Sequence, residues 1–447
     1  MKVGTAIIGA FTTAAVMGLL SASPVLAQQQ SGTNPTKSPA NITSQNPTQN
    51  PSGSPYPSDS NCIPLDSQTP CMNYSTGQTS KTNPTQQNQV VATATSLTQG
   101  INALSNAYTS QRQTAENSIV SEVGTLNATL GTIGGLSNQI AALKADGQST
   151  ADLENQRNAA VGTLSQLVNV KVLEQPNGEL LITTVSGATL PTSGVINPLS
   201  TSGANMQPGS YYPGGGIPAI MLGGIDVTTA LQGGQIGANI ALRDTTLPTD
   251  QAELDEFSQN LASRFATQGI TLFTDPTGAV PTGGGVPVQT GYVGFAGTIQ
   301  VNPAVLANPS SVRDGTPAIS GGLAGFTGII NQVLNNALGD TPPLATNVAN
   351  LGAAGNLTAP YTAPETLGQL ASTVVAAQAQ NSASVTTQLG TEQAVQTTLA
   401  GNLSTQSGVN MDTEMSTMIQ LQNAYGANAR VIAAVQAMWT QLLATVQ

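Results

Sequence analysis

The stretch GVNMDTEMSTMIQLQNAYGANARVIAAVQAMWTQLLATVQ, residues 408–447, carries the strongest structural pattern in the chain. Its large apolar side chains recur at helical intervals and predict one α-helix over 411–446, about 54 Å long. A helix with such a stripe is not stable alone in water, so the stripe needs a partner within the chain or in neighbouring copies. The stripe comprises Met411, Met415, Met418, Tyr425, Ile432, Trp439, Leu442 and Val446.

A second apolar stripe runs from Leu97 to Leu143, with spacings of mostly three and four residues. It predicts a long helix, about 70 Å over this span, with a seam narrow enough for a coiled coil. The glycines at 131–135 predict a break there, because glycine weakens a helix interior. A weaker helical pattern covers 366–403.

The chain is expected to reverse direction after this long helix. Gly147 is a helix stop, and Ser149 with Asp152 three residues on is a capping signal for a second helix that ends near Leu167. The segment VKVLEQPNGELLITTV then predicts two strands around Pro176-Asn177-Gly178, which is a strong hairpin signal.

The middle of the chain, about 186–365, is rich in Gly and Pro with short apolar runs, which indicates small β domains carried on loops. One helix is expected at about 248–268, with Pro248 at its start and Asp250 and Glu253 in its first turn.

The first residues predict a signal peptide over 1–27, because an apolar run is followed by small residues suited to cleavage after Ala27. The alternative is an uncleaved membrane anchor. Residues 28–88 are rich in Pro, Asn, Gln and Ser, which favours a disordered tether. Within it, Cys62 and Cys71 either close a small disulfide loop or remain free thiols.

The composition limits the possible functions. Only 7% of the 447 residues are charged, the formal net charge is -11, and there is no histidine. The negative charge argues against binding nucleic acid. Without histidine, Ser-His-Asp and Cys-His catalysis are excluded, although carboxylate pairs remain possible. We expect no enzyme activity, no cofactor, no metal site, and no membrane association once the leader is cleaved.

Two groups of charged residues are candidate sites. Arg243-Asp244 is interpreted as a local salt bridge at a strand–helix junction rather than a binding pair. The carboxylates of the 248–268 helix are interpreted as a solvated face rather than a cation or acid–base site, because no calcium loop accompanies them. These carboxylates are Asp250, Glu253, Asp255 and Glu256.

Together these patterns predict an α+β protein. We expect an elongated, coiled-coil-like helical rod built from both ends of the chain, with Gly/Pro-rich β domains inserted in the middle. The expected division is a signal peptide at 1–27, a tether at 28–88, the first rod part at 89–170, β-rich outer domains at 171–365, and the second rod part with the terminal helix at 366–447.

From about Val90 to Gln447 the chain resembles the flagellar hook-associated protein 1 family. Residues 136–178 are similar to its helix-turn-helix and hairpin, and 233–265 to its middle helix with the preceding strand. Residues 297–315 resemble a segment found in some members, and 408–443 resemble the terminal helix shared by flagellar axial proteins.

The resemblance implies a structural subunit without chemistry, present as a ring of copies at the extracellular hook–filament junction. It implies paired terminal helices in an inner tube and β domains outside. Implied partners are further copies, hook protein, the second hook-associated protein and a flagellar export chaperone. The implied assembly stripe is Met411, Met415, Met418, Leu421, Tyr425, Ile432, Val435, Trp439 and Leu442. An ordinary intramolecular helix core is the alternative for these residues.

The front of the chain departs from the family. Its members begin with a helical segment that pairs with the terminal helix, and they leave the cell without a cleaved leader. Here a leader, a tether and two cysteines precede the rod. A secreted or periplasmic protein that reuses the rod as a binding or scaffold module, located in the periplasm or the medium, is therefore the alternative function.

Overall fold

The computed structural model describes residues 62–63, 72–73, 84–193, 196–317, 326–407 and 411–444. The expected signal peptide and Cys71 lie outside these residues, and so does the question of a Cys62–Cys71 bridge. Cys62 belongs to the short strand β1 (Cys62–Ile63), which pairs antiparallel with β2 (Met72–Asn73). The chain divides into two compact units, Met1–Ala379 and Gln380–Gln447.

The longest element of the first unit is helix α2 (Pro84–Ala145), which runs for 62 residues. The expected helix is confirmed, but the expected break at 131–135 is wrong. Gly131 and Gly135 face open space, whereas Gly134 lies directly against the backbone of Thr192. Packing on this face stabilises the helix by more than its glycines weaken it.

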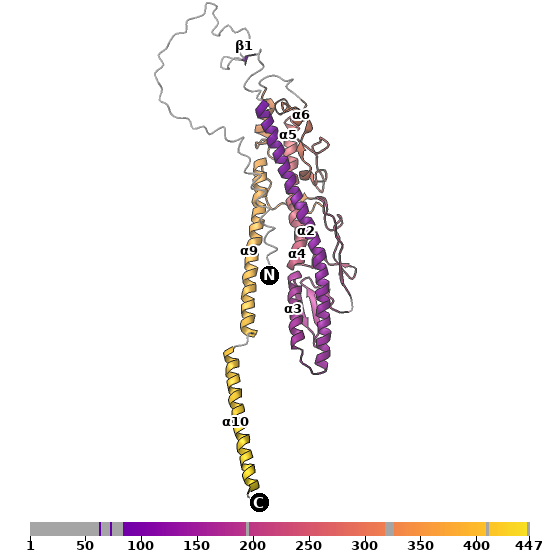
Figure 1. Ribbon diagram of the computed structural model, residues 1–447. Coiled ribbons are helices and arrows are strands. Elements are labelled where there is room, and N and C mark those ends of the chain that lie inside the picture. Colours follow the sequence, from indigo (N-terminus) through magenta and orange to yellow (C-terminus); the bar gives the residue numbers. More distant parts are fainter. Residues whose placement is uncertain are drawn as a thin grey trace, which may run out of the picture. The chain divides into compact units, whose positions relative to one another are not determined.

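Helix α3 (Ala151–Leu167) lies beside one end of α2, with a tight turn between them (Figure 1). Gly147 adopts a φ of +68°, and the amide of Gln148 donates to the carbonyl of Leu143 at 2.9 Å, which confirms the helix stop. The expected cap is wrong by one residue, because Thr150 precedes the helix and makes no side-chain capping bond.

The predicted hairpin is confirmed. Strands β3 (Val170–Glu174) and β4 (Leu180–Thr184) pair antiparallel with Val172 opposite Ile182. β5 (Thr189–Leu190) completes a three-stranded sheet in the order β3-β4-β5. β4 buries alternate side chains against α2 and α3, which makes one end of the first unit a continuous apolar core.

A bent helical run follows the second small sheet, which consists of β6 (Leu199–Ser200), β7 (Met221–Leu222) and β8 (Ile225–Asp226). The 3-10 turn η1 (Thr228–Ala230) leads to α4 (Gly234–Ala241), the π-helical turn η2 (Leu242–Thr246) and α5 (Leu247–Thr267). The expected helix at 248–268 is confirmed, but it is preceded by a helix rather than a strand. Pro248 is the second residue of α5, in its first turn, where its missing amide hydrogen is tolerated.

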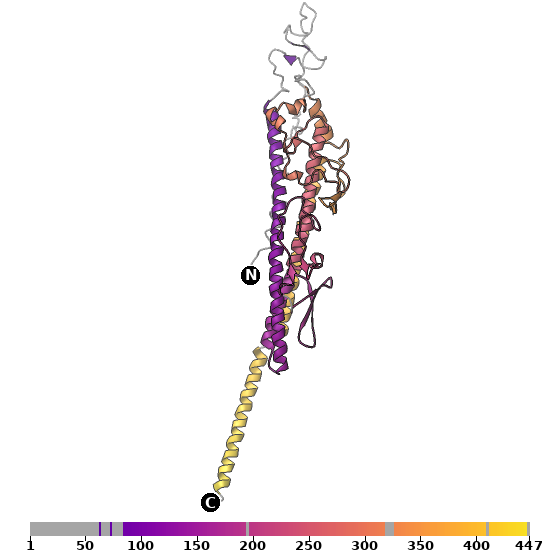
Figure 2. The ribbon, with the colours of Figure 1, turned by 90° about the vertical axis from the view of Figure 1, so that its right-hand side faces the viewer.

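The rest of the first unit packs on α5 and the first half of α2, where it forms the largest apolar core (Figure 2). Its sheets have two strands each, because Gly and Pro repeatedly interrupt pairing. The elements are β9 (Phe273–Thr274) with β10 (Gln300–Val301), η3 (Phe295–Gly297), α6 (Pro303–Ala307), α7 (Ser311–Asp314), α8 (Gly328–Gln332), η4 (Val333–Ala337), and β11 (Ala349–Leu351) with β12 (Leu357–Thr358). Long helices and small antiparallel sheets confirm the α+β class.

Helix α9 (Leu367–Ser407) begins in the first unit, where Leu367, Leu370 and Val374 join the core shared with α2 and α5. The second unit holds the remainder of α9 and helix α10 (Met411–Ala444). The helices expected at 366–403 and 411–446 are thus confirmed.

Candidate assembly surface

The predicted stripe on α10 is exposed. Six of its side chains are described, and each is more than half accessible to solvent. They are Met415, Met418, Leu421, Tyr425, Ile432 and Val435. The side chains of Met411, Trp439 and Leu442 lie outside the described part. Every described side chain from Met415 to Met438 is exposed.

Most of the stripe follows a seven-residue repeat, which Glu414 and Asn428 interrupt and which does not include Met415. Met411, Met418, Tyr425, Ile432 and Trp439 are each seven residues apart, and Leu421, Val435 and Leu442 each lie three residues after one of them. This is the a and d pattern by which one helix packs along another in a left-handed coiled coil. Full burial of one such side chain contributes about 1.5–3 kcal/mol, so the exposed face is a strong candidate for association.

A second site, on α5, corrects the expectation of a solvated acidic face. Glu253, Asp255 and Glu256 are buried, each only 1% exposed. Asp255 accepts hydrogen bonds from the amides of Gly294 (2.7 Å) and Ala296 (2.9 Å). The loops that cover α5 are neutral and far along the chain, and this is why the local charge pattern indicated solvent.

The buried acids of α5 differ in their hydrogen bonding. Glu256 accepts hydrogen bonds from the hydroxyl of Tyr292 (2.7 Å) and the amide of Asn347 (2.8 Å). Burial raises the pKa of Asp255 to about 7, although its bonds to backbone amides oppose the shift. Neither carboxyl oxygen of Glu253 has a hydrogen-bond partner.

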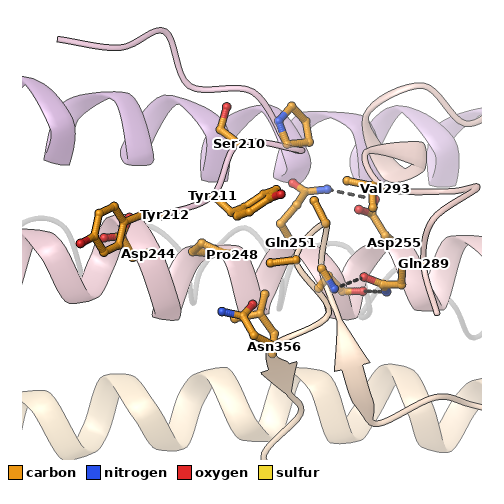
Figure 3. A pocket seen from close by; sticks show the side chains of 16 residues that line it. Ser210, Tyr211, Tyr212, Asp244, Pro248, Gln251, Asp255, Gln289, Val293 and Asn356 are labelled. Atoms are coloured by element: carbon orange, nitrogen blue, oxygen red, sulfur yellow. Dashed lines mark hydrogen bonds between the residues drawn. The ribbon is translucent and has the colours of Figure 1, made fainter. Parts of the chain in front are cut away.

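A small cavity lies beside this row of acids, lined in part by Tyr211, Gln251, Asp255 and Gln289 (Figure 3). Its volume of about 20 Å³ suits a single water molecule rather than a substrate. Gln289 donates to the carbonyl of Ala252 and accepts from the amide of Gly352, each at 2.7 Å. These polar groups hold loops onto α5, which is a structural task.

Arg243 forms the expected salt bridge with Asp244, at 2.8 Å, but on the π turn η2 rather than at a strand–helix junction. It also pairs with Glu116 of α2 at 2.6 Å, and both side chains are fully buried. Arg112, one turn earlier on α2, donates to the carbonyls of Arg243, Gln207 and Ser210.

This buried network was missed in the sequence. The available signal was two charged residues, Arg112 and Glu116, inside the apolar stripe of a helix in a weakly charged chain. Such residues stay buried only when they are paired.

No group of acidic, cysteine or histidine side chains within the described ranges is arranged to hold a metal ion. Among the helices described, none combines the length and the apolarity that crossing a bilayer requires.

Comparison with known proteins bears on both units. Residues 73–279 match the model of the flagellar hook-associated protein FlgK helical domain. Residues 400–445 match the C-terminal model of the flagellar basal body rod FlgEFG proteins. The chain is a FlgK-like flagellar hook-associated protein. The first match spans α2 to α5 and the second spans α10.

Among solved structures, the flagellar hook junction protein FlgK from Burkholderia pseudomallei matches at 26% identity with a TM-score of 0.35. The match covers 46% of this chain and 36% of that one, about a third of its length. No curated protein matches this chain.

Proposed function

We propose that this FlgK-like protein is a self-assembling subunit of the hook–filament junction, in which α10 pairs with helices of neighbouring copies. The carrying observation is the exposed seven-residue repeat of α10, which lies within the match to the flagellar rod C-terminal family. Coiled-coil packing of α10 would complete a helical rod, with the middle of the chain facing outward.

The energetics favour several neighbours over a single pair. Burying six large apolar side chains yields on the order of 10 kcal/mol, at about 1.5–3 kcal/mol each. The loss of translational and rotational freedom on association costs roughly 4–15 kcal/mol. One helix pair is therefore weak, whereas a ring in which α10 contacts copies on two sides gains a second set of contacts.

The proposal extends to partners. By the family resemblance these are hook protein, the second hook-associated protein and an export chaperone, with no nucleic acid, cofactor or substrate. The leader, the Cys62–Cys71 loop and the domain limits given above remain predictions. A secreted scaffold protein is the second candidate, because the predicted leader and tether suit it.

The test places a charge on each side of α10. Ile432→Asp puts a carboxylate in the stripe, and Ala437→Asp puts the same group on the opposite face of the same helix. We expect light scattering to show concentration-dependent oligomers for the wild type and Ala437→Asp, and monomer for Ile432→Asp. Trp439→Asp should also abolish self-association.

A wild-type protein that stays monomeric at high concentration would contradict the proposal. An Ile432→Asp variant with the wild-type mass would do so too. The scaffold candidate predicts a monomer whose mass is indifferent to all three substitutions. The intact mass of protein taken from sheared flagella and from periplasm then separates the two functions, because cleavage after Ala27 supports the second.

A further inference from the structure

Glu253 stands apart from the other acids of α5. Its side chain is 1% exposed, and both carboxyl oxygens lack a hydrogen-bond partner. Asp255 and Glu256, by contrast, accept several hydrogen bonds each. A buried carboxylate without partners is far more costly than a buried neutral acid, so this position favours a bound proton.

The groups around Glu253 come from four parts of the first unit. Asp250 precedes it by one turn of α5, and the charge of Glu253 acts on Tyr108 of α2 and on Tyr361 in the segment between β12 and α9. The Tyr108 hydroxyl donates to Oε1 of Gln378 on α9 at 3.1 Å. The Nε2 group of Gln378 has no partner.

Charge in this cluster is of one sign. The charged group that acts on Glu253 is Asp250, which is also negative, and Asp255 and Glu256 continue the row along α5. The salt bridges among the described residues involve other acids. Ionisation of Glu253 would therefore add a like charge to a cluster that lacks a neutralising cation.

Helix α9 closes this part of the core. Leu370 and Val374 pack into the apolar cluster that includes Tyr108 and Leu254, and Gln378 follows one turn after Val374. Water reaches a buried carboxylate only when a neighbouring element moves aside, and a helix that ends its contact with the core near Ala379 is the element best able to do so.

We propose that Glu253 and Asp250 form a proton-binding pair that fastens the first turns of α9 to α2 and α5, and that its ionisation loosens this contact. The packing of the first turns of α9 against α2 and α5 thereby becomes sensitive to pH. The inference does not depend on self-association or on a location at the junction.

The direction of the effect follows from linkage. Burial, together with the charge of Asp250, raises the pKa of Glu253 to about 8, and burial raises the pKa of Asp250 to about 7. Both values exceed those of unfolded chains, about 3.9 for Asp and 4.3 for Glu. The folded state therefore binds more protons, and the stabilisation is complete below about pH 4 and lost as pH rises to about 8.

The test measures hydrogen exchange in residues 367–379 of the full chain at pH 5.5 and 8.5, after correction for the intrinsic pH dependence of exchange. For the wild type we expect protection to fall by about tenfold or more at the higher pH, the factor that corresponds to one pKa unit. Glu253→Gln, which mimics the protonated acid, should lose less protection than the wild type, because only Asp250 still titrates in it. The double variant Asp250→Asn/Glu253→Gln should keep the same protection at both pH values. Glu365→Gln, an exposed glutamate just before α9, is the matched control and should behave as the wild type.

Equal loss of protection in the wild type and in Glu253→Gln would overturn the proposal, as would a wild type indifferent to pH. If Glu253→Gln does not fold, infrared spectroscopy of the wild type decides. Because Asp255 contributes such a band as well, the spectra are also recorded for Asp255→Asn. In that variant the band of a protonated carboxylic acid must still be present at pH 5.5 and lost on titration to pH 9. Absence of that band at pH 5.5 contradicts the proton pair.

Discussion

Helices α2 and α10 carry the same kind of sequence pattern and use it differently. Along α2 the stripe is buried within the chain, and Ile119, Leu126 and Leu130 are inaccessible to solvent. Along α10 the stripe is exposed, with Tyr425 at 78%. An apolar stripe therefore predicts that a helix packs against a partner, but it does not indicate where that partner comes from.

The charged residues of the two helices extend the contrast. Glu116 of α2 is buried against Arg243, whereas Arg430 of α10 is exposed. Glu116→Ala leaves Arg243 with part of its charge uncompensated and removes a bond to the amide of Ala204, so we expect a loss of about 3–5 kcal/mol in unfolding free energy. Arg430→Ala should change it by less than about 0.5 kcal/mol. Denaturant titration of both variants checks this, and equal losses would break the comparison.

One residue type tests the stripes directly. Leu126→Ala opens a cavity in the core of the first unit and should lower the unfolding free energy by about 2–5 kcal/mol. Leu421→Ala removes the same atoms from an exposed site of α10 and should leave the stability of the monomer nearly unchanged. Calorimetry at low protein concentration measures both. A marked drop in Tm for Leu421→Ala would show that the α10 stripe is covered within a single chain.

The smallest expected changes in stability come from substituting two neighbouring glycines of α2. Gly135→Ala meets open space in a helix interior and should stabilise the protein by about 0.4–1 kcal/mol. Gly134→Ala drives a methyl group into the carbonyl of Thr192 and should destabilise it. Thermal unfolding of the pair compares them. The same sign for both would contradict the close approach of the 192 backbone.

Much of the secondary structure was predictable, because its signals are local. Helical spacing located α2, α9 and α10, Gly147 marked a turn, and Pro176-Asn177-Gly178 marked the hairpin. The break expected in α2 was wrong because the preference of a glycine for bending is a small term beside the packing of a whole helix face.

The site was predictable only in part. The stripe on α10 could be listed from spacing, but its exposure could not. The spacing of the acids on α5 predicts a solvated face, because the groups that cover them, at Gly294 and Asn347, lie about 40 and 90 residues away and are uncharged. The burial of Arg112 and Glu116 could not be predicted for the same reason. Their partners are in loops and turns roughly 90–130 residues along the chain.

The sequence by itself determined where the long helices of this protein form and that two of them carry apolar stripes, because helix formation depends on residues within about four positions of each other. Only the tertiary structure decided that the stripe of α2 is buried and that of α10 exposed. It also decided that the acids of α5 are buried and that Glu253 lacks a hydrogen-bond partner. Burial is set by which distant segments cover a side chain, and no local pattern contains that information.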